Sequence, residues 1–190
     1  MDLRHLFFKY RSYTPIGFIL LLLICADPTW PRFFCGLAVL LLGETIRFWG
    51  VAYAGSATRT TGAAGGDRLV TDGPYGHMRN PLYVGNFFIS LGFLIMTWVW
   101  IPWMIVVFMV LFGLQYSLIV HLEEEYLSDR FKESYREYRQ SVPRWIPRLK
   151  LYKGSEESDP RFVNTLKSER NTLQAIAAVC GLLLVRWHFL

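Results

Sequence analysis

The chain has 190 residues, of which 53% are hydrophobic, 16% aromatic and 18% charged, and its formal net charge is +5. Soluble domains usually carry about 25% charged residues, so these values exclude a disordered chain, a collagen-like chain and a disulfide-rich secreted scaffold. The length allows about one domain. Long apolar runs alternate with compact charged stretches. The composition and the apolar runs therefore predict a small polytopic membrane protein, an all-α bundle of about five transmembrane helices.

The basic residues and the cysteines each suggest a simple role. Lys and Arg beside membrane spans usually contact anionic lipid headgroups, and no nucleic-acid-binding module or basic recognition helix occurs. We therefore expect membrane lipids, and no nucleic acid, as partners. Cys25, Cys35 and Cys180 lie in or beside apolar runs without C-x-x-C spacing. They are expected to act as small apolar side chains, and no metal site is predicted.

Five apolar segments approach the roughly 20 residues that a helix needs to cross a bilayer. They are 13–26 with an extension to Trp30, then 33–54, 82–100, 101–120 and 173–190. The first lacks a small-residue cleavage site and is expected to be a retained span. The third and fourth form a tight hairpin with an aromatic turn at 98–103. The fifth carries Arg186 and His188 and either crosses the bilayer or lies in its interface.

The distribution of Lys and Arg predicts the orientation. Basic residues gather before the first span, between the second and third spans, and over 122–170, whereas the opposite side carries Arg32 and Arg186. The positive-inside rule places the N-terminus, the 55–81 loop and the 122–170 segment in the cytoplasm. A site built from these two polar segments would lie at the cytoplasmic membrane face. A plasma membrane is expected because no organelle signal is visible.

The polar segment before the third span combines a loop with a helix start. Residues 55–66 have the composition of a flexible loop and no phosphate-binding spacing. Asp72-Gly73-Pro74 indicates a turn. Asn80 and Pro81 suit the N-cap and the first turn of the next helix. That explanation does not account for the arginine, histidine and two tyrosines that crowd the same membrane entrance.

The fourth span continues into a charged helix as far as about Tyr138. Four side chains at spacings of four, four and three form one apolar-aromatic face: Leu127, Phe131, Tyr135 and Tyr138. Val142-Pro143 ends the helix. At the exit of the span, Glu123, Glu124 and Glu125 repel one another near the bilayer. We expect a lysine, an arginine or a cationic ligand to offset this charge.

One ionisable pair falls inside the second span. Glu44 and Arg47 are three residues apart and share a helix face. Ionisable residues within a span are costly and indicate function by default. Two interpretations stay open: a mutually satisfied pair that fixes helix packing, and a functional pair.

Two ordered motifs resemble those of a known superfamily. Residues 69–75 and 79–85 resemble the pattern G-x-Y…R-H-P-x-Y-x-G, and 123–143 resembles E-E-x-x-L-x-x-x-F-G-x-x-Y-x-x-Y…V-P. Together they are similar to the isoprenylcysteine carboxyl methyltransferase and phospholipid N-methyltransferase superfamily over residues 67–148. The resemblance divides the chain into a methyltransferase-like domain, 1–150, and a tail, 151–190. The tail is interpreted as a polar linker to Arg170, followed by a hydrophobic helix.

The resemblance implies an integral membrane methyltransferase that has no Rossmann domain, uses S-adenosylmethionine and takes a lipophilic acceptor from the bilayer. By position, it assigns cofactor contacts to Arg68, Leu69, Val70, Tyr75, Asn80, Pro81, Leu82, Tyr83, Glu123 and Glu124. Carboxylates suit the cationic sulfonium and amino groups, and tyrosines offer a flat wall to adenine. Methyl transfer itself needs mainly alignment. Glu123 and His121 are the candidate catalytic residues, and His121 either accepts a proton or is a structural histidine at a helix end.

Three positions depart from the family pattern. Asn80 stands where the family usually has His, so it can hydrogen bond but cannot titrate. Lys132 stands where the family usually has Gly, which predicts a local change only. Ile119 stands where an arginine would hold a substrate carboxylate. This argues against a prenylcysteine carboxylate as acceptor, unless one of three arginines substitutes: Arg47, Arg144 or Arg148.

Two alternative functions stay open. The departures at Asn80 and Ile119 also suit a non-catalytic membrane binding or partner protein on the same scaffold. An NADPH-dependent membrane reductase is a further alternative, and the three glutamates argue against it because they would repel the 2′-phosphate. The methylated atom could be nitrogen, oxygen or sulfur, and the oligomeric state is open.

Overall fold

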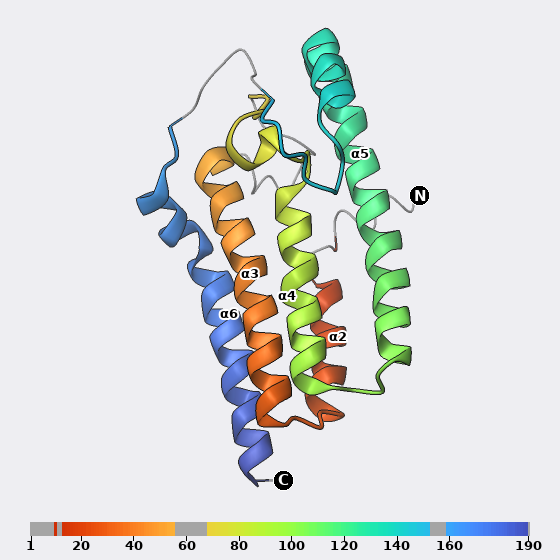
Figure 1. Ribbon diagram of the computed structural model, residues 1–190, viewed down its shortest axis with the longest axis vertical. Helices are drawn as coiled ribbons and strands as arrows, with labels where there is room; N and C mark the ends of the chain where they lie inside the picture. Colours follow the sequence, from red (N-terminus) through yellow and green to blue (C-terminus); the bar gives the residue numbers. More distant parts are fainter. Residues whose placement is uncertain (1–9, 11–12, 56–67, 153–158, 190) are drawn as a thin grey trace.

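The computed structural model describes residue 10 and residues 13–55, 68–152 and 159–189, and these residues form a helical bundle with no strand (Figure 1). The elements are α2 (Thr14–Ile24), α3 (Trp30–Ala54), the short 3₁₀ helix η2 (Gly73–Gly76), α4 (Pro81–Thr97), α5 (Trp103–Ser141) and α6 (Phe162–Phe189). The prediction of an all-α membrane bundle is confirmed. The loop predicted over 55–66 lies, apart from Gly55, outside the described residues.

Each of the five predicted apolar segments forms a helix, but their lengths differ. By length and composition α3, α5 and α6 can cross a membrane, whereas α4 has 17 residues and α2 has 11. At 1.5 Å per residue α2 is about 16 Å long, roughly half of a bilayer core. Large apolar side chains such as Leu41, Leu111 and Leu182 are exposed on the outer faces, which suits contact with lipid.

The α3–α4 pair packs closely because glycines face each other along it. A Cβ on Gly36 would lie 2.5 Å from the carbonyl oxygen of Gly92, and a Cβ on Gly43 would lie 2.6 Å from that of Gly85. Lipid gives helices no hydrophobic reason to associate, so close backbone approach at small residues is a main source of packing energy in membranes. The contact fixes α3 and α4 relative to each other.

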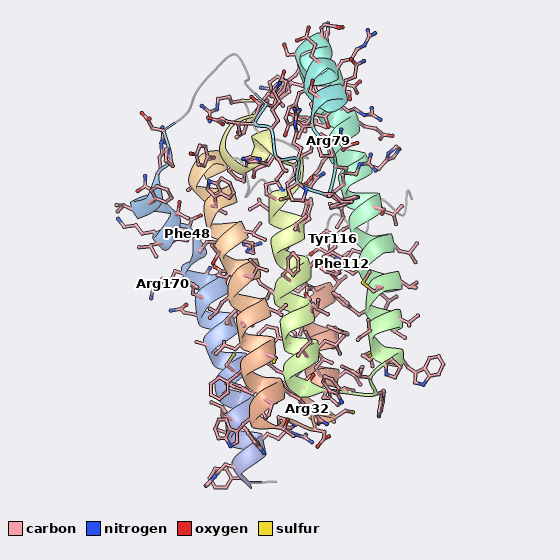
Figure 2. All side chains as sticks on the ribbon, in the orientation of Figure 1. Arg32, Phe48, Arg79, Phe112, Tyr116 and Arg170 are labelled. Atoms are coloured by element: carbon pink, nitrogen blue, oxygen red, sulfur yellow. The ribbon has the colours of Figure 1, made fainter. Side chains whose placement is uncertain are left out.

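Helix α5 packs on α4 through tilted and edge-on contacts between aromatic rings. Phe87 of α4 lies 5.4 Å from Phe108 and 5.3 Å from Phe112 of α5, and Phe112 lies 4.1 Å from Tyr116. Figure 2 shows Phe112 and Tyr116 between the two helices, with Arg79 above them and Arg32 at the opposite end. The hydrophobic core fills the half of the bundle near the α4–α5 turn, where Leu40, Leu94 and Leu183 are buried.

Helix α6 lies along α3 within the bundle (Figure 1). The Phe48 and Phe162 rings stack 6.2 Å apart at one end, and the Trp30 and Trp187 rings lie 4.4 Å apart at the other. Arg186 donates hydrogen bonds to two backbone carbonyls at and beyond the C-terminal end of α2. This packing along a candidate span favours the alternative in which α6 crosses the bilayer. The prediction of a linker as far as Arg170 is wrong from Phe162 onward, where α6 begins.

Helix α5 breaks at Lys132, although the sequence pattern predicts a continuous helix. Lys132 has φ 42° and ψ −112°, a conformation that a side chain disfavours and that glycine adopts readily. The predicted aromatic face continues across the break, and Tyr135 and Tyr138 are buried against Leu69. The helix ends at Ser141, as predicted from Val142-Pro143.

The segment after α5, residues 142–152, runs back beside η2 and the start of α4 and is called the returning segment below. The backbone N–H of Arg79 donates to Pro143 at 2.9 Å, that of Arg148 to His77 at 3.0 Å, and that of Tyr152 to Gly76 at 3.0 Å. The Tyr138 hydroxyl donates to the Tyr75 carbonyl at 2.8 Å. These bonds join the two sequence motifs into one structure at this end of the bundle.

Candidate active site

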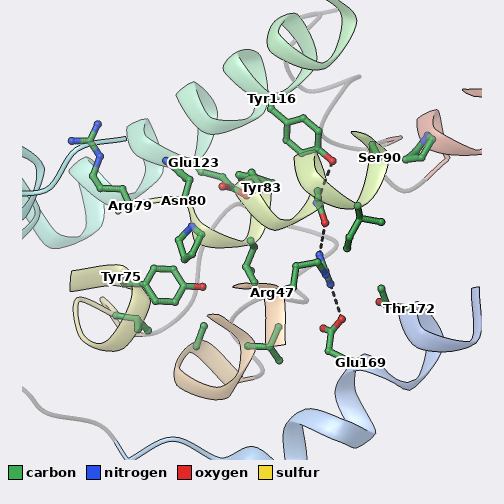
Figure 3. A pocket seen from close by; sticks show the side chains of 18 of the residues that line it. Arg47, Tyr75, Arg79, Asn80, Tyr83, Ser90, Tyr116, Glu123, Glu169 and Thr172 are labelled. Atoms are coloured by element: carbon green, nitrogen blue, oxygen red, sulfur yellow. Dashed lines mark hydrogen bonds and ion pairs between the residues drawn. The ribbon is translucent and has the colours of Figure 1, made fainter. Parts of the chain in front are cut away.

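A cavity of about 790 Å³ lies where the two motifs meet, and its walls come from α2 to α6 and residues 68–70 (Figure 3). Its volume is typical of small-molecule sites, which span roughly 300–1,000 Å³. All ten residues predicted to contact the cofactor line it: Arg68, Leu69, Val70, Tyr75, Asn80, Pro81, Leu82, Tyr83, Glu123 and Glu124. The structure thus brings the predicted residues together, and their role in cofactor binding stays a prediction.

Glu123 is the predicted catalytic residue that lies at the cavity wall. The Tyr83 hydroxyl of α4 donates a 2.6 Å hydrogen bond to Glu123 Oε1 of α5, and the Tyr83 ring lies 4.8 Å from the Tyr116 ring. The bond orients the carboxylate at the junction of the two helices. A carboxylate held in this way can accept hydrogen bonds from hydroxyl or amino groups, and it attracts a cation.

Glu124 is the buried centre of a charged cluster. Arg79 donates to Glu124 Oε1 from Nε at 3.2 Å and from Nη2 at 3.0 Å, and Arg144 donates to both carboxylate oxygens at 3.1 and 2.5 Å. Arg79 also donates to the backbone carbonyls of Arg139 and Val142. Two arginines therefore supply the cation that the sequence predicts, and Glu124 fastens the returning segment to α5.

Tyr75 contributes a neutral phenol to the cavity. Burial raises its pKa above the ordinary value, the nearby Glu123 carboxylate raises it further, and Arg47 opposes the shift. The phenol therefore stays protonated at physiological pH and can donate a hydrogen bond. Its ring offers the flat apolar surface that an adenine would need.

Arg47 joins four helices deeper in the bundle. Its Nη1 donates to Asn86 Oδ1 at 2.5 Å and its Nη2 to Glu169 Oε2 at 2.8 Å, while Asn86 Nδ2 donates to the Tyr116 hydroxyl at 3.2 Å. A Cβ on Gly85 would lie 2.4 Å from Arg47 Cγ. Glycine at this motif position therefore lets the Arg47 side chain cross α4.

The predicted Glu44–Arg47 pair exists, but it is not the main interaction of Arg47. Arg47 Nε lies 3.8 Å from Glu44 Oε2, beyond hydrogen-bond distance, and neither Glu44 oxygen hydrogen bonds to a described residue. The terminal nitrogens of Arg47 bind Asn86 and Glu169 instead. The interpretation of a mutually satisfied pair is therefore wrong.

Other candidate residues have different surroundings. His121 does not line the cavity, its side chain is 56% exposed, and its Nε2 lies 3.2 Å from Glu125 Oε1. Its position does not support the proton-accepting interpretation, and it lies in the middle of α5 instead of at the helix end that the structural interpretation expected. Asn80 directly precedes α4, but its side chain makes no capping hydrogen bond; its Nδ2 donates to the Arg144 carbonyl at 3.1 Å.

Three arginines are candidate substitutes for the family arginine that Ile119 replaces, and of these Arg47 lines the cavity whereas Arg144 and Arg148 do not. Arg144 binds Glu124, and Arg148 donates to the Ser141 carbonyl. Ile119 itself is fully buried beside Tyr116 and Leu122.

Sequence reasoning missed the polar residues of the inner cavity wall: Asn86, Ser90, Tyr116, Glu169 and Thr172. Asn86 in an apolar segment is a signal that could have been noticed, because an amide in lipid requires a partner. Glu169 gave no signal, because it lies among polar residues at the start of α6 and outside both motifs.

The family model described as phospholipid methyltransferase matches residues 31–134, which include α3 apart from its first residue, all of α4 and most of α5. This chain belongs to the phospholipid methyltransferase family. The recognition made from the two motifs is confirmed, and the family also supports an integral membrane protein with methyltransferase character. Helix α6 lies outside the matched residues.

Three curated relatives show moderate similarity. The cobalt-zinc-cadmium resistance protein CzcN of Cupriavidus metallidurans is 33% identical over 63% of this chain, and the nickel-cobalt-cadmium resistance protein NccN of Alcaligenes xylosoxydans xylosoxydans is 30% identical over 73%. The protein-S-isoprenylcysteine O-methyltransferase of Schizosaccharomyces pombe is 32% identical over 58%. The matches span 50%, 63% and 48% of the relatives' own lengths.

No solved structure matches this chain. Within the described residues, no group of three or more His, Cys, Asp and Glu side chains is placed to hold a metal ion. The predictions that no metal and no nucleic acid bind stay predictions.

Proposed function

We propose that this protein transfers a methyl group from S-adenosylmethionine to a lipophilic acceptor at the cytoplasmic membrane face. The observation that carries the proposal is the convergence of ten family-assigned residues on one cavity. Membership of the phospholipid methyltransferase family and the similarity to an isoprenylcysteine O-methyltransferase support it. The acceptor would enter from the bilayer, since the cavity walls include apolar residues of α2 and α6.

The cavity residues suit this cofactor. When bound, S-adenosylmethionine supplies an electrophilic methyl group on a cationic sulfonium. Glu123, oriented by Tyr83, would attract the positive charge and accept hydrogen bonds from amino or ribose hydroxyl groups. Tyr75 would stack on the adenine or donate to it. The protein's main contribution would then be alignment, which can supply much of the acceleration of a two-reactant transfer.

The orientation in the membrane is part of the proposal. Arg79, Arg144 and Arg148 lie together with the returning segment at the cavity end of the bundle. The positive-inside rule places this end in the cytoplasm, where S-adenosylmethionine would reach the cavity from water. The plasma membrane is the proposed location.

Cofactor binding in matched variants tests the proposal. We expect Glu123→Gln to raise the Kd for S-adenosylmethionine by about tenfold to a hundredfold, because a charge-assisted hydrogen bond contributes about 1.5–3 kcal/mol. Tyr83→Phe should weaken binding less, since it removes only the group that orients the carboxylate. Equilibrium binding of labelled cofactor to the detergent-purified protein measures both.

The control is Glu133→Gln, at an exposed carboxylate of α5 that pairs with Arg136 on the surface. It should bind as the wild type does. Unchanged binding in Glu123→Gln would contradict the site assignment. Binding without turnover over a broad acceptor panel would favour the non-catalytic alternative, which the names of the two resistance-protein relatives keep open. Saturable binding of NADPH would favour a reductase.

A further inference from the structure

The inner half of the cavity has a polar wall and an apolar end that the proposed cofactor contacts leave unused. Arg47, Asn86, Tyr116 and Glu169 form the polar wall, and dashed lines in Figure 3 follow their bonds from Tyr116 to Glu169. Beyond them the lining is mainly apolar: Phe18, Ile19, Ile89, Phe93, Ile176 and Val179. This arrangement suits a ligand with a small polar head and an apolar tail.

The position of the polar wall along the membrane normal suits the polar head group of an amphiphile. About 26 Å of helix separates Arg47 from Trp30 on α3. Trp30 packs on Trp187, and paired tryptophans at a helix end are typical of a membrane interface. With a hydrocarbon core of roughly 30 Å, Arg47 and Glu169 lie near the opposite boundary. An amphiphile in that leaflet would carry its head group at this level.

Glu169 provides the carboxylate of this polar wall that can act as a base. Its side chain is 3% exposed, and Arg47 binds its Oε2. Among the described residues no hydrogen bond is made to Oε1, and the residue lines the cavity. Arg47 holds the carboxylate on one side and leaves the second oxygen for a ligand.

The charges around Glu169 restrict the acceptor. Arg47 of α3 pairs with Glu169 and also lies against Glu44 of α3, whereas Asn86 of α4 and Tyr116 of α5 are neutral. The other charged residues among the described cavity lining are Arg68, Arg79, Glu123 and Glu124. A carboxylate acceptor would meet these acids, while Arg47 is already bound to Glu169 and Asn86. An amine would be held as an ammonium ion, which has no lone pair to attack a methyl group.

We propose that Glu169 of α6 is a catalytic residue that binds the O–H or S–H of a neutral amphiphilic acceptor and takes its proton, with Arg47 as the positioning residue. The inference rests on the proposed methyl transfer and deepens it by naming the acceptor class. In the step, a lone pair of the acceptor oxygen or sulfur forms a bond to the methyl carbon. The methyl–sulfonium bond breaks, its electron pair goes to the cofactor sulfur, and the acceptor proton goes to Glu169.

A carboxylate that is paired with an arginine is basic enough to accept this proton. The acceptor atom becomes positively charged as its bond to carbon forms, so its proton becomes strongly acidic during the step. General-base assistance of this kind contributes typically about 10²–10⁴-fold. Glu44, on the other side of Arg47, offsets part of the guanidinium charge that would otherwise weaken the base.

The test uses the full chain in detergent, S-adenosylmethionine with a labelled methyl group, and four probes with the same ten-carbon chain: decanol, decanethiol, decylamine and decanoic acid. We expect label in the alcohol or the thiol, with kcat/KM at least about tenfold above the amine and the acid. Glu169→Gln should lower kcat about 100-fold, with an unchanged Kd for the cofactor. Its rate should rise with pH more steeply than that of the wild type, because hydroxide must then take the proton.

Glu169→Gln keeps an oxygen that can accept the Arg47 hydrogen bond, and Glu133→Gln is the matched control with wild-type kcat. Should Glu169→Gln fail to fold, Glu169→Asp withdraws the carboxylate by one methylene and should lower kcat at least about tenfold. The proposal is overturned by a kcat of Glu169→Gln within threefold of wild type, by preference for the acid or the amine, or by no methylation of alcohol and thiol in protein that binds the cofactor. Failure of the wild type to bind S-adenosylmethionine would instead overturn the proposed function.

Discussion

At the residue scale, Lys132 shows how a departure from the family pattern becomes a structural feature. The sequence predicts only a local change where the family usually has glycine. The structure places Lys132 at φ 42°, where an L side chain is disfavoured. The family glycine therefore has a conformational explanation, which a helical hydrophobic pattern cannot reveal because it records side-chain faces and not backbone angles.

Lys132→Gly is accordingly expected to stabilise the protein by about 1 kcal/mol, since relief of a positive φ exceeds the added flexibility of the unfolded chain. Arg136→Gly is the matched control, an exposed basic residue on the same helix with ordinary helical geometry. It should lose about 1 kcal/mol. Thermal unfolding of both variants in detergent measures the difference, and a loss of stability in both would contradict the account of Lys132.

The charged residues of the site were predictable in type but not in partner. Three adjacent glutamates at a span exit indicate a need for cations, and two arginines bind Glu124. The identity of those arginines depends on the return of residues 142–152 beside η2. Likewise, Glu169 meets Arg47 only because α6 lies along α3, a contact between residues 122 positions apart.

At the element scale, the apolar segments predicted the helices well because each one must bury its backbone hydrogen bonds in lipid. Their ends were less predictable. Helix α6 begins at Phe162, within a segment interpreted from the sequence as a linker because its residues are polar. Its first turns are helical all the same and pack on the bundle through the buried Thr165 and Glu169. Helix α2 has only 11 residues and ends at Ile24, so the predicted extension to Trp30 is mostly the connection to α3, which carries Pro28.

The close α3–α4 contact leads to a stability prediction. Gly92→Val would place a methyl-bearing Cβ 2.6 Å from the Gly36 carbonyl oxygen, so the two backbones would have to separate. We expect a loss of about 2 kcal/mol or more. Gly113→Val is the control, because a Cβ at Gly113 meets no atom within 4 Å. Equal thermal stability of the two variants would show that the glycine contact does not hold the helices together.

At the scale of the whole molecule, one bundle carries a core at one end and a cavity at the other. The core residues Leu40, Leu94 and Leu183 come from α3, α4 and α6, and the cavity takes walls from each of the described helices α2 to α6. The motifs predicted, residue by residue, the outer half of the cavity, to which we assign the proposed cofactor. They could not predict the inner half, because α2 and α6 lie outside the motifs and reach the cavity only through packing.

The most direct test of the central claim is the thermal stability of the purified protein with and without S-adenosylmethionine or S-adenosylhomocysteine. A ligand at about 100 times its Kd should add about 2.7 kcal/mol of apparent stability. We predict a saturable rise in Tm with both ligands and none with NADPH. Folded protein whose Tm does not change at millimolar concentrations of either ligand would contradict the assignment of the cavity to this cofactor.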